Sequence, residues 1–136
     1  MKRTLLAVLT AFAVGGAGAE PQDAPVVRVS GSYIFRTYCA SCHGAEGRGD
    51  GPLAADLRYR PSDLTLIARR NGGEFPTEKV VRIVDGRKPV KGHGGADMPV
   101  WGDAFRNVET GYDEAAAQER IRAVVDHLRS IQAPAR

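Results

Sequence analysis

Five consecutive residues, Cys39-Ala40-Ser41-Cys42-His43, constrain this chain more than any other part of its sequence. They include both cysteines of a chain of 136 residues. Cys-x-x-Cys-His is the attachment pattern of a covalently bound haem. Two thiols on about one helical turn can form thioethers with the two vinyl groups of the haem, and the histidine that follows is held beneath the ring as an axial ligand of the iron. The motif therefore predicts one haem c, attached through Cys39 and Cys42 and ligated by His43.

Two thiols at this spacing have three other interpretations. A structural disulfide would close a very small loop and would constrain the unfolded chain little. A thioredoxin-like redox pair needs a βαβ context, which the sequence does not show. A structural zinc site needs four protein ligands, so it would require the distant His93 besides the motif. Haem is favoured because the five-residue motif is complete.

The first 19 residues have the pattern of a secretory signal peptide. Lys2 and Arg3 precede an apolar run over residues 5–14, and the small residues Ala17-Gly18-Ala19 follow it. The run is shorter than the roughly 20 apolar residues that span a membrane, and no cysteine for a lipid follows the cleavage site. We therefore expect residues 1–19 to be removed on export to the periplasm, with no stable membrane insertion afterwards.

Removal of this segment leaves a chain with almost no net charge. The 19 basic and 16 acidic residues become 17 and 16, because the segment contains two basic residues and no acidic one. This balance does not indicate nucleic-acid binding. Two prolines over residues 20–29 predict a loose N-terminal segment, and one domain is expected over residues 30–136.

Hydrophobic periodicity and capping residues predict an all-α domain of three to five helices with long loops. The expected helices span residues 30–42, 64–70, 77–84 and 113–131. Ser30 and Thr77 are candidate N-caps, and Gly86 is a candidate helix terminator. Residues 88–103 are rich in Gly and Pro and are expected to be irregular. Such long loops suit a domain that wraps them around one haem.

The ligand on the far face of the haem decides between an electron carrier and a catalyst. Met1 would leave with the signal peptide, so Met98 is the methionine of the mature chain, 55 residues after His43. A thioether favours Fe(II) and raises the reduction potential. His93, in a Gly-rich stretch, is a competing ligand, whereas His127 is expected to pack in the core. We predict Met98 as the second axial ligand.

Together these features resemble the class I (mitochondrial-type) cytochromes c, especially small periplasmic members from bacteria, over residues 30–131. In that family a glycine and an aromatic residue of the first helix pack against the last helix, and Gly31 and Phe35 match those positions. The glycine lets the two helices cross closely, and the aromatic ring fills the adjoining space. The last helix of the family usually has an aromatic residue at this crossing, where this chain has His127.

The same resemblance implies roles for residues near the haem. The carbonyl oxygen of Pro52 would accept a hydrogen bond from His43 and raise the basicity of the ring. Arg60 and Trp101 would donate to the haem propionates. Residues 61–65 match the Pro-x-Asp-Leu-Thr segment of many bacterial members.

These observations predict a periplasmic mono-haem cytochrome that carries single electrons. Electron transfer needs no acid, base or nucleophile, so we expect no catalytic residue and no enzyme activity. The partners would be redox proteins: a membrane cytochrome complex, an oxidase or a periplasmic dehydrogenase. The chain would act as a monomer or as a subunit of a complex. Basic residues before Met98 form a candidate docking patch for an acidic partner, namely Lys79, Arg82, Arg87, Lys88 and Lys91.

Three rival functions remain open from the sequence. The chain could be the cytochrome subunit of a periplasmic dehydrogenase or oxidase complex. It could be a haem enzyme or a gas-binding protein with an open iron site, against which Met98 argues. It could also be a thiol–disulfide redox protein that holds no haem.

Overall fold

The computed structural model describes residues 29–87, 98–108 and 111–134. The predicted signal peptide, nearly all of the predicted loose segment, and His93 lie outside these ranges. The helices and strands, in chain order, are α1 (Gly31–Tyr38), α2 (Ala40–His43), the 3₁₀ helix η1 (Leu64–Leu66), α3 (Ile67–Arg70), α4 (Thr77–Asp85), α5 (Trp101–Ala104), β1 (Asn107–Val108), β2 (Gly111–Tyr112) and α6 (Glu114–Ser130).

The predicted all-α class is confirmed. The strands β1 and β2 have two residues each and pair antiparallel as a minimal hairpin before α6. The described residues contain six α-helices, which is more than the three to five expected, because several are single turns. The expected helix over residues 30–42 breaks at Cys39 into α1 and α2. Residues 101–104, which were expected to be irregular, form α5, because a turn of helix can begin after Pro99 and pack through the buried Phe105.

Most helix boundaries follow from the capping residues. The hydroxyl of Ser30 accepts a hydrogen bond from the backbone N–H of the third residue of α1, as expected. Gly86 ends α4 in the left-handed region, at φ 70°, also as expected. The prediction for Thr77 was wrong: Thr77 is the first residue inside α4, and Pro76 precedes it. The carboxylate of Asp113 caps α6.

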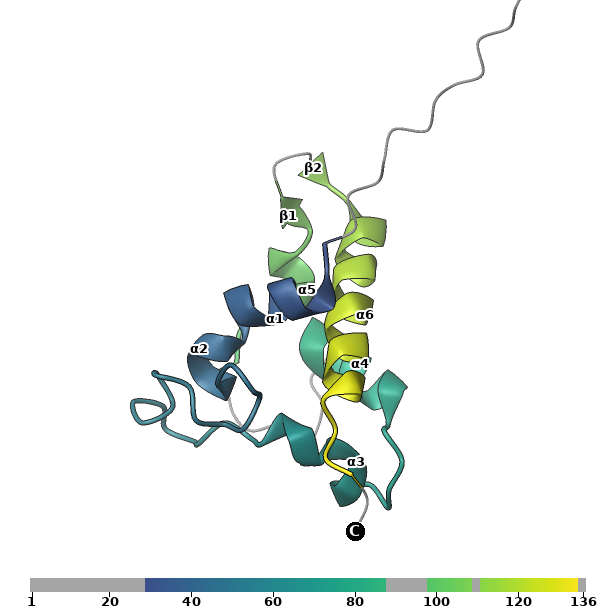
Figure 1. Ribbon diagram of the computed structural model, residues 1–136. Helices are drawn as coiled ribbons and strands as arrows, with labels where there is room; N and C mark the ends of the chain where they lie inside the picture. The colour runs from purple at the N-terminus through teal and green to yellow at the C-terminus, as the bar shows by residue number, and fades with distance from the viewer. Residues whose placement is uncertain (1–28, 88–97, 109–110, 135–136) are drawn as a thin grey trace, which may run out of the picture.

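The helices α1 and α6 cross at close range, as Figure 1 shows. A Cβ atom on Gly31 would overlap the carbonyl oxygen of Ala123, so only glycine fits there. Phe35 is fully buried, and its ring lies 5.2 Å from that of His127 between centroids. Burial, and then the charge of Arg36, lower the pKa of His127 below its usual value. The expected crossing residues are therefore confirmed, and His127 is a packing residue.

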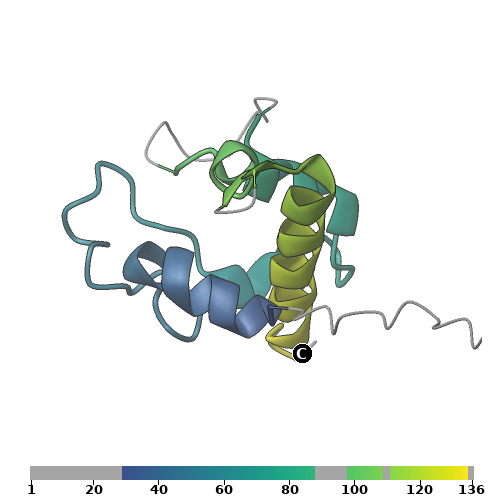
Figure 2. The same ribbon diagram turned by 90° about the horizontal axis from the view of Figure 1, so that it is seen from above.

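The core lies along α6, which contacts α1 on one side and α4 and α5 on another (Figure 2). Its largest fully buried side chains are Phe35, Ile34, Ile121, Val124 and Val125. Beyond α6, the side chain of Gln132 donates to the carbonyl of Leu64 at 2.8 Å and accepts from the N–H of Ala68 at 2.9 Å. The segment after α6 is therefore hydrogen-bonded to η1 and α3, two elements that contribute residues to the cavity of the functional site.

Candidate functional site

A cavity of about 480 Å³ lies between α1, α2, η1, α3, α4 and α6. This volume is in the range of cofactor sites. Most of the side chains around it are apolar, contributed by helices on every side. Six of the seven residues predicted from the sequence line it: Cys39, Cys42, His43, Arg60, Met98 and Trp101. The seventh, Pro52, is exposed and is not part of the lining.

The two cysteines and the histidine are presented by a single helical turn. The N–H of His43 donates to the carbonyl of Cys39 at 2.9 Å, and the N–H of Cys42 donates to the same oxygen at 3.2 Å. Both thiols are free and half-buried. Because one short turn fixes all three backbones, their side chains line the same cavity.

A returning loop holds this turn in place. The backbone oxygens of residues 41, 42 and 43 accept hydrogen bonds from the N–H groups of residues 53, 51 and 49, at 2.9, 3.2 and 2.8 Å. A Cβ atom on Gly51 would meet the oxygen of Ser41 at 2.5 Å, so the approach requires glycine. Sequence reasoning missed this role of Gly51, for which the alternate glycines at 47, 49 and 51 were the available signal.

The imidazole of His43 has its Nδ1 atom 3.2 Å from the backbone oxygen of Ser62. With a proton on Nδ1 that donates to this oxygen, Nε2 keeps its lone pair and can bind a metal. The sequence pointed to the carbonyl of Pro52 for this role, which stays a prediction. Ser62 was missed because it acts through a backbone oxygen, which leaves no signature in the residue type.

The thiol of Cys39 is a poor nucleophile in this environment. Burial, and then the neighbouring Cys42, raise the pKa of Cys39 to about 12. Redox-active cysteines instead have a lowered pKa, because the thiolate is the reacting form. Within the described residues, no three His, Cys, Asp or Glu side chains are grouped so that they could hold a metal ion. The raised pKa disfavours the thiol–disulfide interpretation, whereas the zinc interpretation involves His93, which lies outside the described residues.

Met98 also lines the cavity and is half-buried. The ring of Trp101 stacks on Phe105 with centroids 5.6 Å apart and meets Tyr38 edge-on at 5.6 Å. These rings form an apolar wall between α1 and α5. Arg60 is exposed at the edge of the cavity. The roles of Trp101 and Arg60 toward propionates stay predictions.

The candidate basic patch is smaller than the sequence indicated. Lys79 and Arg82 are exposed on α4. Arg87, however, is bound to two carboxylates, those of Asp85 and Glu114, so its charge is already compensated. The remaining members, residues 88 and 91, lie outside the described residues. Within the described residues, the candidate docking patch therefore consists of Lys79 and Arg82.

Comparison with known proteins decides the family. Residues 29–132 match the sequence profile of cytochrome c. The chain belongs to the cytochrome c family. A cytochrome c binds haem c covalently and transfers electrons through its iron. The residues present fit that cofactor: two thiols, an imidazole and a thioether all line one largely apolar cavity.

This chain is also similar in sequence to a subunit of an oxidase. It is 34% identical over 85 residues to the cbb3-type cytochrome c oxidase subunit FixP of Azorhizobium caulinodans. The match covers 62% of this chain and 24% of FixP, so the alignment spans about a quarter of that protein. No solved structure matches the chain. In the part of the chain that the structure describes, no helix has the length and hydrophobicity to cross a membrane.

Proposed function

We propose that this cytochrome c is exported to the periplasm, binds a single haem, and passes single electrons between redox proteins. His43 and Met98 are the axial ligands in this proposal. The observation that carries it is that Cys39, Cys42, His43 and Met98, separated by up to 59 residues, line the same cavity. A cytochrome with both axial positions filled changes little between its two oxidation states, which suits a carrier more than a catalyst.

Each residue has a separate task. A bound haem supplies the one-electron couple of its iron. Cys39 and Cys42 hold it by thioethers, which prevents its loss after export. The bond between His43 Nδ1 and the oxygen of Ser62 fixes the orientation of the imidazole. The thioether of Met98 raises the potential, and the apolar walls around Trp101 exclude water.

Two features of the sequence support the cellular part of the proposal. Residues 1–19 have the pattern of a cleaved signal peptide, and covalent attachment of haem suits an exported protein. The chain contains one Cys-x-x-Cys-His motif, which accounts for one haem. In this proposal the cytochrome domain occupies residues 30–136, with residues 20–29 as a loose N-terminal segment.

The test uses the protein purified from the periplasm of cells that make c-type cytochromes. We expect a mass equal to the chain from Glu20 plus one haem, and a low-spin, six-coordinate ferric spectrum. A mass without the haem would revive the thiol–disulfide function. A high-spin ferric spectrum in the wild-type protein would instead favour a haem enzyme or a gas-binding protein.

A second candidate function is motivated by the similarity to FixP. The chain could serve as the cytochrome subunit of an oxidase or dehydrogenase complex, with the same chemistry at the iron. Gentle extraction from the native cells separates the two. A free carrier elutes as a monomer in the periplasmic fraction, whereas a subunit elutes with its oxidase or dehydrogenase.

A further inference from the structure

The two described flanks of the segment that carries Met98 lie against each other. A Cβ atom on Gly86, at the end of α4, would lie 3.3 Å from the Cα of Val100. A Cβ atom on Gly102, in α5, would overlap a carboxylate oxygen of Asp85. Gly102 is buried, so α5 is seated directly on the end of α4. The chain therefore returns to the same place on both sides of Met98.

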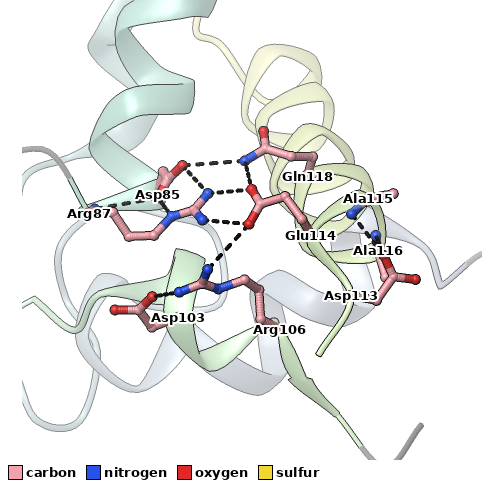
Figure 3. A network of polar contacts seen from close by, with 9 residues as sticks. All are labelled: Asp85, Arg87, Asp103, Arg106, Asp113, Glu114, Ala115, Ala116 and Gln118. Atoms are coloured by element: carbon pink, nitrogen blue, oxygen red, sulfur yellow. Dashed lines mark hydrogen bonds and ion pairs between the residues drawn. The ribbon is translucent and has the colours of Figure 1, made fainter. Parts of the chain in front are cut away.

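An arginine next to this contact joins it to α6, as Figure 3 shows. Arg87 forms two forked pairs. Its Nε and Nη2 atoms donate to the carboxylate of Asp85 at 2.5 and 2.8 Å. Its Nη1 and Nη2 atoms donate to the carboxylate of Glu114 at 2.7 and 2.8 Å. Forked pairs of this kind fix geometry as well as charge.

Glu114 is the shared acceptor of this cluster. It lies in the first turn of α6, where the helix dipole favours a negative charge. Arg106, just after α5, donates to Glu114 at 3.5 Å and also binds Asp103. Gln118 donates to Glu114 at 3.1 Å. We call Asp85, Arg87, Arg106 and Glu114 the Glu114 clamp; it connects the end of α4, the end of α5 and the start of α6.

We propose that the Glu114 clamp is a positioning device for Met98, with Arg87 and Glu114 as its central pair. This inference depends on the proposed role of Met98 as an axial ligand. A single thioether is a weak ligand, so its occupancy depends on how well the protein holds it in place. Anchoring both flanks lowers the entropy that is lost when Met98 binds. The side chains of Arg87 and Arg106 are only 23% and 18% exposed, whereas that of Glu114 is 49% exposed, so the clamp is a partly exposed network of ion pairs.

The test measures how often Met98 leaves the iron in the ferric holoprotein. Added imidazole can bind only after Met98 has left, so at high imidazole concentration the binding rate approaches the rate of Met98 dissociation. We would compare Arg87→Gln, Glu114→Gln and the double variant with the wild type. Asp126→Asn is the matched control, because it removes a carboxylate from the same helix and breaks its 3.2 Å pair with Arg129, away from the flanks.

We expect the limiting rate to rise about five-fold in each clamp variant, the factor that corresponds to loss of a favourable partly exposed ion pair. The effects of the two substitutions should combine to less than their product in the double variant, because both single variants already remove the Arg87–Glu114 pair. The control should bind imidazole at the wild-type rate. Should one clamp variant fail to fold, the other decides.

The clamp proposal fails if both clamp variants match Asp126→Asn, or if their effects add in the double variant. Failure of the proposed ligand looks different. If Met98 is not the ligand, imidazole binds the wild type as fast as it binds Met98→Ala. In the reduced protein, the Met98 side-chain signals would then also lack the upfield NMR shift that the haem ring current produces.

Discussion

The two sides of the cavity are built in different ways. On the cysteine–histidine side, residues 39–43 form one turn of helix whose hydrogen bonds are local, and a nearby loop returns to cover it. On the methionine side, the turn of α5 also has local hydrogen bonds, but it begins after Met98. The flanks of Met98 contact α4 and α6, among other places through the Glu114 clamp. A contiguous motif can place the backbones of three functional residues by itself, whereas an isolated ligand needs tertiary contacts on both flanks.

The two sides should therefore respond to different perturbations. The first rests on the buried crossing of α1 with α6, where Phe35 is inaccessible to solvent. Mutations in that apolar contact should affect it most. The second rests on partly exposed ion pairs, which acid and salt weaken. Substitutions on each side and a change of pH should separate the two, with effects that decrease from the helix crossing to the ion pairs.

The crossing of α1 with α6, which supports the cysteine–histidine side, should not tolerate even one added carbon atom. We expect Gly31→Ala to lower the free energy of unfolding by about 3 kcal/mol, because the new Cβ would overlap the backbone at Ala123. Alanine is favoured over glycine within a helix, so the loss isolates the crossing. The measurement is denaturant unfolding of the holoprotein.

Gly72→Ala is the matched control for that substitution. Gly72 has a φ of 73°, and no neighbouring atom lies within 4 Å of the position that a Cβ would take. Only backbone strain of about 1 kcal/mol is therefore expected there. Equal losses at Gly31 and Gly72 would contradict a close crossing of α1 with α6.

Attachment of the haem should depend on the cysteine–histidine side alone. Cys42→Ala leaves one thioether partner, so we expect a several-fold lower yield of holoprotein. Met98→Ala should leave the yield unchanged, because Met98 makes no covalent bond in the proposal. Mass spectrometry of the periplasmic protein measures both. A comparable loss in the two variants would mean that the sides are not separable during assembly.

Removal of the Met98 thioether should change the iron without changing its attachment. We expect Met98→Ala and Met98→Leu to lower the reduction potential alike, because both lack the sulfur atom while leucine keeps the bulk. A potentiometric titration gives the values. An unchanged potential in both variants would transfer the ligand role to His93.

Acid should weaken the methionine side of the cavity more than the cysteine–histidine side, and this is the smallest of the expected effects. Hydrogen bonds from Arg87 lower the pKa of Glu114 from 4.5 to about 2. A lowered folded-state pKa means that Glu114 stabilises the fold above pH 4.5, and that this contribution is lost as the pH falls toward 2. The stability difference between wild type and Glu114→Gln should therefore shrink over this pH window and also with added salt. A difference that stays constant from about pH 6 down to the lowered pKa would contradict the pairing.

Much of the fold could be predicted because its signals are local. Ser30, Gly86 and Asp113 sit at the ends of their helices as capping rules require. Predictions failed where packing overrides a local preference: Thr77 lies inside α4, and a Gly- and Pro-rich stretch ends in α5. The second failure involves a single turn, whose stability comes from contacts with other helices rather than from its own residues.

The family, the covalent haem and the helical class could all be predicted from the amino-acid sequence, since each follows from a contiguous motif or from a period along one helix. Two contacts became visible in the folded chain alone: the backbone oxygen of Ser62 lies next to the His43 ring, and Arg87 pairs with Glu114. Such contacts join residues 19 and 27 positions apart. They depend on the path of the backbone between the two residues, which no local pattern encodes.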